Sequence, residues 1–349
     1  MPVDPTPNTG SGAQLGHPPL GVTFASFQAL GADKALVAAR WALSMGYRSF
    51  WTAETTGPEA FATLAAAGAT APGLDLGTGV LALQLRSPGL TAMGAATLAA
   101  LHPDSDILLG VGISSPVVTT QWHGVPYGDR PVRRVAEFID VVGQCLAGDA
   151  VTHDGEFYSV SKFRLGVRLG DRKPRIVVGA LNARMLGLAG AAADGVLLNY
   201  LPASAVPWCV EQVRAGEAAA GRASGSCTVY AYVHVGVCER SGGIEAARRD
   251  LFSYMVVDAY ADAFRRAGFE REVDEVRAAH ARRDRDAALA AVSDAMVDAI
   301  DIMGDAAHVR SAVAAYYDAG VDHAVIMPLP WGPDRMATIE ATMQAARQW

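Results

Sequence analysis

The chain has 349 residues, of which 51% are hydrophobic and 19% are charged, and its formal net charge is -7 at pH 7. This composition excludes a disordered protein, a coiled coil and a fibrous repeat, and the acidic balance argues against nucleic acid as the main partner. The length fits either one large α/β barrel or two ordinary domains.

The N-terminal segment differs from the rest of the chain. Residues 1–17 are rich in Pro, Thr, Gly and Asn and lack the basic start and apolar core of a signal peptide. We expect a flexible arm there, followed by a single domain over 18–349. No apolar run reaches the length of a membrane span, so no membrane contact is expected. The cysteines are too widely spaced for a disulfide framework or a zinc site, which predicts a soluble, cytoplasmic protein.

Short apolar segments alternate with amphipathic segments from residue 20 to the end of the chain. The predicted strands, in chain order, cover residues 20–25, 47–52, 74–81, 107–112, 175–179, 195–199, 227–237 and 323–328. The predicted helices cover 33–45, 58–69, 88–101, 131–146, 183–192, 203–220, 305–318 and 333–348. Strands that are apolar on both faces suit a parallel sheet covered by helices. Eight such units in unbroken order predict a (β/α)8 TIM barrel, with a doubly wound sheet as the structural alternative.

Two stretches are too long for a plain connection between a strand and its helix. Residues 151–160, VTHDGEFYSV, predict a hairpin insertion after strand four, with Asp154 and Gly155 at the turn. Residues 241–304, after strand seven, predict a mostly helical insertion whose middle is highly charged. In a barrel this second insertion would lie over the catalytic end, as a lid or a dimer element. The charged run also fits a solvated helix face.

The standard catalytic signatures are missing from the chain, which has no G-x-S-x-G elbow, Walker loop or H-E-x-x-H motif. The histidines lack ligand spacing, so no metal is expected. The site of a barrel is built at the C-terminal ends of its strands, where Glu54 is the only carboxylate immediately at a strand end. The segments 112–115 and 179–182 offer small residues at strand-to-helix turns, where free amides bind anions. Such a site suits a large anionic cofactor that brings its own chemistry.

Structural explanations for single residues stay open at this point. Glu54 also fits an exposed loop carboxylate, and His123 fits a structural histidine. The tryptophans Trp51, Trp122 and Trp331 all fit a core position.

Several of these segments resemble the luciferase-like monooxygenase superfamily, and within it the oxidoreductases that depend on flavin or on the deazaflavin coenzyme F420. The resemblance extends over nearly all of residues 20–340. It rests on GYRSFWTAET (46–55), LGTGVLALQLRSP (76–88), LLGVGISSP (108–116), QWHGVPYGDRP (121–131), the predicted hairpin and VVGALNARMLGLAGAAADGVLLNYLP (177–202).

The resemblance implies a TIM barrel, usually a homodimer, that binds its cofactor at the C-terminal end of the strands. It implies a cis peptide between Gly79 and Val80 that supports the deazaflavin ring, contact of Glu54 with the hydroxyl region of the ring, and capture of the phosphate by the turn 179–184. The cofactor-binding residues expected from the resemblance and the strand ends are Ser26, Glu54, Gly79, Val80, Gly112, Ser114, Ser115, Gly179, Ala180, Leu181, Asn182 and Arg184.

The chain also departs from the members of this superfamily that oxidise sugar phosphates. Those members carry a histidine after the strand-two acid, where this chain has Thr55, and an acid after the strand-four glycine, where it has Ile113 and Ser114. Their substrate and proton donor therefore do not carry over, and Glu54 and His123 are the candidate catalytic residues. The expected substrate is small and partly apolar, because the candidate pocket residues are Phe27, Leu83, Trp122, Tyr200 and Trp331.

These observations lead to one main functional hypothesis and two alternatives. The main hypothesis is a coenzyme F420-dependent oxidoreductase that transfers a hydride to or from an organic substrate. The alternatives are an FMN-dependent luciferase-like monooxygenase and a catalytically silent barrel that only binds the cofactor.

Overall fold

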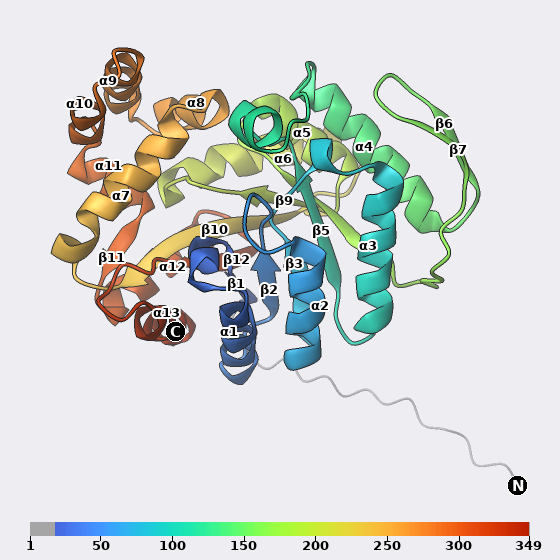
Figure 1. Cartoon of the computed structure of the whole chain (residues 1–349), viewed down its shortest axis with the longest axis horizontal. Coiled ribbons are helices and arrows are strands. Elements are labelled where there is room, and N and C mark those ends of the chain that lie inside the picture. Colours follow the sequence, from blue (N-terminus) through green and yellow to red (C-terminus); the bar gives the residue numbers. More distant parts are fainter. Residues whose placement is uncertain (1–17, 349) are drawn as a thin grey trace, which may run out of the picture.

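The computed structural model describes residues 18–348, so the predicted arm over 1–17 lies outside the described residues. Parallel strands form a closed barrel, which confirms the predicted TIM-barrel fold (Figure 1). In chain order they are β1 (Leu20–Thr23), β2 (Ser49–Thr52), β3 (Asp75–Thr78), β5 (Ile107–Gly112), β8 (Arg175–Gly179), β9 (Gly195–Leu198), β10 (Thr228–Val237) and β12 (His323–Pro328). Each strand pairs with the next, and β12 pairs with β1 to close the barrel. The short strand β4 (Leu81–Ala82) follows β3 and, like β3, pairs with β5.

Helices surround the barrel and cover the outer face of the strands (Figure 1). They are α1 (Asp33–Ser44), α2 (Ala60–Thr70), α3 (Pro88–Leu101), α4 (Pro131–Ala147), α5 (Ala183–Ala192), α6 (Val206–Ala219), α12 (Ala306–Asp318) and α13 (Arg335–Arg347). Single helical turns lie at η1 (Ala25–Leu30), η2 (Leu83–Leu85), η3 (Val117–Trp122) and η4 (Ala203–Ala205).

The first turns of the helices follow capping chemistry. Pro88 and Pro131 each begin a helix, as expected for a residue whose missing amide would have no partner in the first turn. The helix expected from residue 58 begins later, at Ala60. Glu59 is its N-cap, and the carboxylate of Glu59 accepts a hydrogen bond from the Ala62 amide at 2.7 Å.

Both predicted insertions are present. The hairpin consists of β6 (Val151–Asp154) and β7 (Ser159–Phe163), and it lies outside the barrel beside α4 (Figure 1). The helical insertion comprises α7 (Arg240–Met255), α8 (Asp258–Arg266), α9 (Glu270–Ala281), α10 (Arg285–Ala290) and α11 (Asp294–Ile300). The insertion is mostly helical, as expected, and it ends in the short strand β11 (Ile302–Gly304), which pairs with β10. β10 extends beyond the end of β9, and β11 pairs with that extension.

The buried hydrophobic residues that the structure describes form three separate clusters. A large cluster lies between the strands and the surrounding helices. A second cluster fills the barrel itself and includes Trp51, Tyr230 and Tyr232, with Val80 packed against it. A third cluster joins the helical insertion to the barrel and includes Tyr200, with Trp331 against it. No helix in the described part of the chain combines the length and the apolar character that crossing a membrane requires.

Candidate functional site

The C-terminal end of β3 forms a ledge, which we define as Gly79 and Val80. The peptide between them is cis, as predicted. The hydroxyl of Tyr232, on β10, donates a hydrogen bond to the Gly79 carbonyl oxygen at 3.0 Å across the barrel. Val80 is half-buried and lies over the cluster that fills the barrel. The ledge is thus an apolar surface held from below by a buried tyrosine.

Glycines on the neighbouring strands make room for the ledge. A Cβ atom at Gly112, the last residue of β5, would lie 2.9 Å from a Val80 methyl group. A Cβ atom at Gly179, the last residue of β8, would lie 3.3 Å from the other Val80 methyl group. Any larger residue at these positions would therefore displace Val80. Three strand ends converge here with little side-chain bulk, which suits the close approach of a flat ring to the backbone.

Glu54 follows β2 and forms a bidentate ion pair with Arg86. Its two carboxylate oxygens accept hydrogen bonds from Nη2 and Nε of Arg86 at 2.8 and 3.1 Å, and Arg86 also pairs with Glu59. Burial opposes ionisation of Glu54, but the hydrogen bonds and charge of Arg86 outweigh it and hold the pKa of Glu54 below its usual value. Glu54 is therefore an ionised carboxylate, a state suited to orienting a polar group rather than to donating a proton.

The segment after β5 reaches across to β2. Ser115 accepts a hydrogen bond from the Val118 amide at 3.3 Å, which stabilises the turn η3. Ser114 is half-buried beside it. His123 is exposed, and its Nε2 lies 2.7 Å from the Thr55 carbonyl oxygen. The structure thus places both candidate catalytic residues, Glu54 and His123, near the end of β2.

Ser26 follows β1, the strand that pairs with β2. Its hydroxyl donates a hydrogen bond to the Pro328 carbonyl oxygen at 2.6 Å, which ties the end of β1 to the end of β12. This contact gives Ser26 a structural partner next to the barrel opening.

The turn after β8 begins helix α5. Ala180 and Leu181 pass from the strand into the turn, and Asn182 is the N-cap, whose side chain accepts a hydrogen bond from the Met185 amide at 3.0 Å. The first amides of a helix have no partner within it, so this turn can bind an anion. Arg184 lies in this first turn and is exposed.

A second arginine near this turn was not expected from the sequence. Arg266, at the end of α8, donates a hydrogen bond to the Leu181 carbonyl oxygen, and its guanidinium lies 4.6 Å from the centre of the Trp208 ring. The insertion therefore brings a cation to the turn at the start of α5. No sequence pattern pointed to Arg266, because it is 85 positions from Leu181 in the chain.

The expected pocket residues have different environments. Phe27 and Leu83 are each 1% exposed and belong to the core between strands and helices, so the expectation that they line a pocket is wrong. Tyr200 and Trp331 contact the helical insertion, and Trp122 is 56% exposed.

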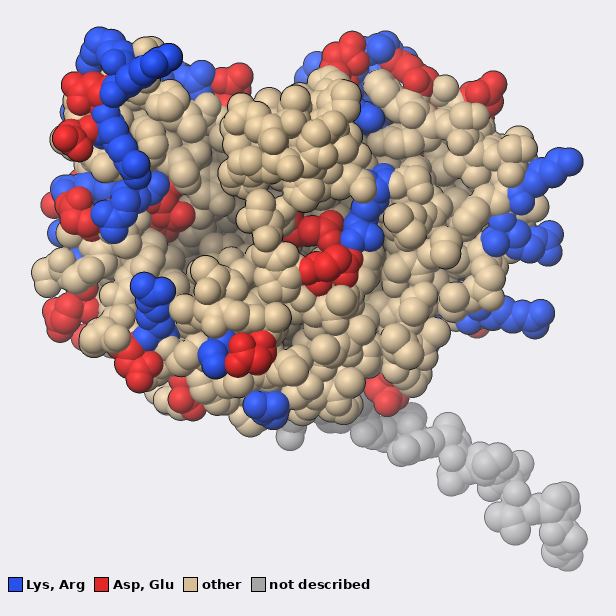
Figure 2. Space-filling view, viewed as in Figure 1, with Lys and Arg blue, Asp and Glu red and all other residues tan. Residues whose placement is uncertain are grey.

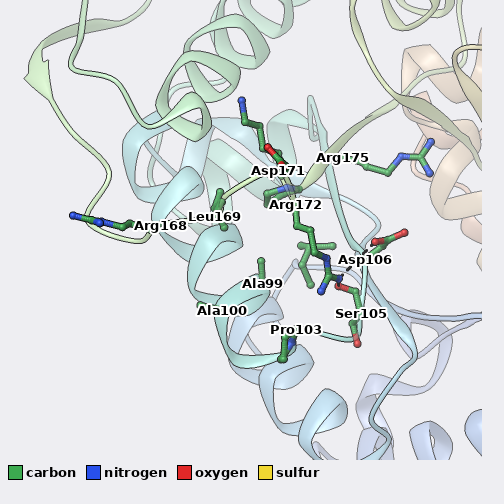
Figure 3. Close-up of a pocket in the computed structure, with 13 residues that line it drawn as sticks. Ala99, Ala100, Pro103, Ser105, Asp106, Arg168, Leu169, Asp171, Arg172 and Arg175 are labelled. Carbon is green, nitrogen blue, oxygen red and sulfur yellow. Dashed lines mark hydrogen bonds and ion pairs between the residues drawn. The ribbon is translucent and has the colours of Figure 1, made fainter. Parts of the chain in front are cut away.

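A cavity of about 400 Å³ lies at the opposite end of the barrel (Figure 3). It is bordered by Ser105 and Asp106 before β5 and by Arg172 before β8. These residues precede their strands, so the cavity is at the N-terminal end, away from the ledge. In TIM barrels the active site is at the other end.

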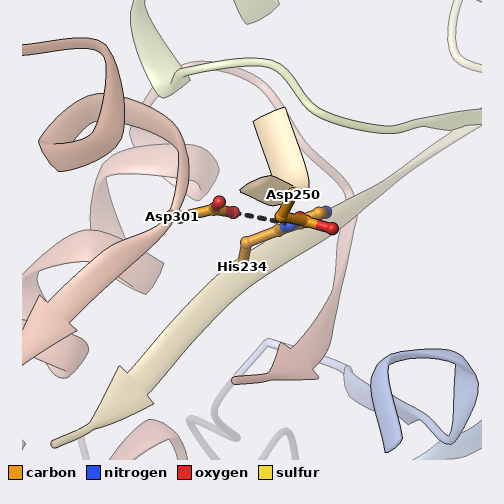
Figure 4. A group of neighbouring side chains, drawn as sticks. All are labelled: His234, Asp250 and Asp301. Carbon is orange, nitrogen blue, oxygen red and sulfur yellow. Dashed lines mark hydrogen bonds and ion pairs between the residues drawn. The ribbon is translucent and has the colours of Figure 1, made fainter. Parts of the chain in front are cut away.

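A buried polar cluster lies where the insertion meets β10 (Figure 4), and we define it as His234, Asp250 and Asp301. His234 Nδ1 lies 3.1 Å from Asp301 Oδ1, and Asp250 accepts a hydrogen bond from the Tyr200 hydroxyl at 2.8 Å. Sequence reasoning missed this cluster, although the alternation of Tyr230, Tyr232 and His234 along one predicted strand placed all three on one face.

Comparisons with known proteins agree on one family. The sequence profile described as luciferase-like monooxygenase matches residues 17–323. A protein of Mycobacterium tuberculosis, named as a coenzyme F420-dependent oxidoreductase, is 31% identical over 303 residues, covering 80% of this chain and 86% of that protein. The 5,10-methylenetetrahydromethanopterin reductase of Archaeoglobus fulgidus is 28% identical over 272 residues, covering 76% of this chain and 80% of that protein.

Solved structures share the fold at low sequence identity. The coenzyme F420-dependent tetrahydromethanopterin reductase of Methanopyrus kandleri superposes with a TM-score of 0.79 at 22% identity, covering 95% of this chain and 98% of that chain. The oxygenating constituent of 3,6-diketocamphane monooxygenase of Pseudomonas putida, in complex with FMN, superposes with a TM-score of 0.66 at 15% identity, covering 95% and 97%.

Proposed function

The chain belongs to the luciferase-like monooxygenase family of oxidoreductases, and from this premise we propose that it uses coenzyme F420 to transfer a hydride to or from a small, partly apolar organic substrate. The curated relatives support this choice of cofactor, since their names include F420-dependent oxidoreductases. The single observation that carries the proposal is the ledge of Gly79 and Val80 between the glycine ends of β5 and β8.

The residues around the ledge fit a deazaflavin. When bound, a deazaflavin supplies the hydride and does not activate oxygen as a flavin does. The ledge offers an apolar surface against which a ring can be held face to face with a substrate, and holding reactants in this geometry is itself a large part of catalysis. The side chains of Glu54 and Arg86 add a fixed pair of charges at the end of β2, where they can orient polar groups at the edge of the ring.

The phosphate of the cofactor fits the turn at the start of α5. The free amides of Ala183 and Arg184 provide donors, and Arg184 and Arg266 provide positive charge. Asn182 supports this arrangement by capping the helix, which fixes the direction of its first amides.

Titration of the apo protein with coenzyme F420 and with FMN, followed by ligand fluorescence, tests this proposal. We expect tighter binding of F420. Gly112→Ala should weaken that binding because its Cβ would displace Val80, whereas Gly187→Ala, in α5 with open space around it, should not. Tighter binding of FMN, or oxygen uptake with reduced FMN, would instead favour the monooxygenase alternative, which the FMN-bound relative supports. Binding of F420 without turnover of any alcohol, enone or pterin would favour the silent barrel.

We further propose that the protein is a cytoplasmic homodimer. Leu90, Met93 and Leu101 are 50%, 46% and 60% exposed and lie on one face of α3, which would bury apolar surface against a second copy. The free cysteines, three of them buried, accord with a reducing compartment. Light scattering after size-exclusion chromatography should give twice the chain mass, and the double variant Leu90→Glu with Met93→Glu should give the monomer mass.

A further inference from the structure

The inner face of β10 carries a polar side chain one step above the ledge. Side chains alternate along a strand, so residues two apart lie on the same face. Tyr230 and Tyr232 belong to the cluster inside the barrel, and the Tyr232 hydroxyl contacts the Gly79 carbonyl oxygen. His234 is therefore the next inward residue towards the C-terminal end. On the neighbouring strand it is paired in register with Met327 of β12, which also belongs to the cluster inside the barrel.

The hydrogen bonds of His234 require one proton that is shared between His234 and Asp301. Its Nε2 lies 2.9 Å from Asn199 Oδ1, an oxygen that also accepts from the Tyr200 amide at 3.0 Å. Because that oxygen acts as an acceptor, Nε2 must carry a hydrogen. The contact of 3.1 Å between Nδ1 and Asp301 Oδ1 then needs one more proton, held either by His234 or by Asp301.

The environment of Asp301 favours the carboxyl group as the holder of this proton. Asp301 is fully buried, and its Oδ2 has no hydrogen-bond partner among the residues that the structure describes. A buried oxygen without a partner costs more free energy on a charged carboxylate than on a neutral acid. Burial accordingly raises the pKa of Asp301 well above its usual value and lowers the pKa of His234 to about 4.

Asp250 brings a second carboxyl group to the same place from the insertion. The nitrogen and oxygen atoms of His234, Asp250 and Asp301 that face one another all lie within 4.8 Å. Burial is the largest cause that raises the pKa of Asp250, to about 7. Unlike His234 and Asp301, Asp250 keeps part of its surface accessible.

The groups that face this cluster from the surrounding elements are hydroxyls rather than cations. They are Tyr200 after β9, Tyr254 on α7, Tyr260 on α8 and Tyr316 on α12. Within residues 18–348 no lysine or arginine makes a hydrogen bond or ion pair with His234, Asp250 or Asp301. Without a cation to balance two carboxylates, the cluster retains protons near neutral pH.

Hydride chemistry on an organic substrate needs such a proton. A hydride that adds to the electron-poor carbon of a C=O or C=C bond carries two electrons, and the other atom of that bond then takes one proton. In the reverse direction, the substrate loses a hydride from carbon and a proton from its partner atom. Of the earlier candidates, Glu54 is ionised by Arg86, and His123 is exposed with Nε2 at the Thr55 carbonyl oxygen.

We propose that His234, Asp250 and Asp301 form a proton-holding cluster that exchanges the one proton accompanying hydride transfer, with Asp250 as the exchanging group and the other two as positioning residues. This inference rests on the proposed function. In the reductive direction Asp250 gives its proton to the substrate and regains one from solvent, while the His234–Asp301 pair keeps its own proton and fixes the carboxyl group beside it. Figures 1 and 2 share one view, and the molecule is hollowed beside the insertion that carries Asp250.

The first test is the pH profile of turnover for three variants. Asp250→Asn removes the exchanging proton, Asp301→Asn perturbs the pair behind it, and Asp298→Asn, an exposed carboxylate on α11 paired with Arg240, is the matched control. In the reductive direction, kcat of the native enzyme should fall as pH rises through the pKa of Asp250. Asp250→Asn should lower kcat roughly 100-fold or more with little change in KM, and should lose this pH dependence. A native-like profile in Asp250→Asn would overturn the proposal.

The second test needs neither cofactor nor turnover. In the apo protein labelled with ¹⁵N-histidine, the signal assigned to His234 through His234→Gln should show a neutral ring with hydrogen on Nε2 and no titration between pH 5 and 8. Asp301→Asn should shift that signal, and Asp298→Asn should not. An ordinary titration near pH 6.5, or a stoichiometric divalent cation found by mass spectrometry and lost in Asp301→Asn, would overturn the proposal. Failure to bind F420 would instead contradict the proposed function.

Discussion

Two regions at the C-terminal end of the barrel place a carboxyl group beside a basic side chain, with opposite results. Glu54 pairs with Arg86 at the end of β2, and its pKa is lowered. Asp301 pairs with His234 at the end of β10, and its pKa is raised. Proximity of acid and base therefore does not decide the protonation state.

The difference follows from the number of donors and from water. Arg86 is permanently charged and offers two donors to Glu54, and both side chains keep about one seventh of their surface exposed, at 15% and 14%. One ring nitrogen of His234, Nε2, is hydrogen-bonded to Asn199, so only Nδ1 can contact Asp301. Asp301 is also fully buried. Ionisation of Glu54 is favoured because its partner is a cation and water reaches the pair. Ionisation of Asp301 is opposed because its partner is a neutral ring and the site is buried.

The largest expected effect is on stability. Asp301→Ala should lower the free energy of unfolding by about 1–3 kcal/mol, the range for leaving a buried polar group without its hydrogen-bond partner. Glu54→Ala should cost about 1 kcal/mol or less, since its pair reaches the surface. Urea denaturation of both variants measures the difference. Equal losses would show that burial does not separate the two regions.

The second prediction concerns the pH dependence of stability, which should have opposite signs. Above pH 7, the unfolded chain has a mostly neutral His234 and ionised Asp250 and Asp301, whereas the folded cluster holds at least one additional proton. The folded state thus binds more protons, and this region should make the free energy of unfolding fall by about 1.4 kcal/mol per pH unit as pH rises above 7. Asp301→Asn should reduce that slope in denaturation curves measured at several pH values.

Glu54 contributes in the other direction. Its pKa is lower in the folded protein, so its stabilising contribution is present above its unfolded pKa and is lost as pH falls through the folded value. Arg86→Met should weaken this loss on acidification and leave the alkaline slope unchanged. A change in the alkaline slope would mean that the two regions are coupled.

The third prediction separates orientation from proton exchange. Glu54→Gln keeps an oxygen that can accept from Arg86, so turnover should fall by less than about tenfold, below the range of a general acid or base. Its pH profile should keep the native shape. A loss of 100-fold or more, together with a changed profile, would return Glu54 to the role of proton exchanger.

The smallest effect is expected at the proposed phosphate-binding turn, where two exposed arginines, one with contacts and one without, can be compared. Arg266 contacts Leu181 and Trp208, whereas Arg184 makes no hydrogen bond or ion pair within residues 18–348. Arg266→Ala should weaken binding of F420 by about 1 kcal/mol in low salt, and Arg184→Ala should weaken it less. Fluorescence titration gives both values, and the reverse order would identify Arg184 as the phosphate-binding side chain.

The barrel, its two insertions and the ledge at Gly79 and Val80 were predictable from the sequence. The signals that predicted them are local: the periods of strands and helices, the prolines in first turns and the glycine-rich strand ends. Such signals depend only on residues that are close in the sequence. The resemblance supplied the cis peptide, which the structure contains.

Only the tertiary structure decided which charged groups meet. Arg86 lies 32 positions from Glu54, and Asp301 lies 67 positions from His234, so no spacing rule joins either pair. Barrel closure brings Arg86 to the end of β2, and the pairing of β11 with β10 brings Asp301 opposite His234. Protonation depends on burial and on partners from distant segments. The sequence therefore predicted the strand ends at which a site is expected, and the packing of the insertion on the barrel decided which acids are buried and which are paired with arginine.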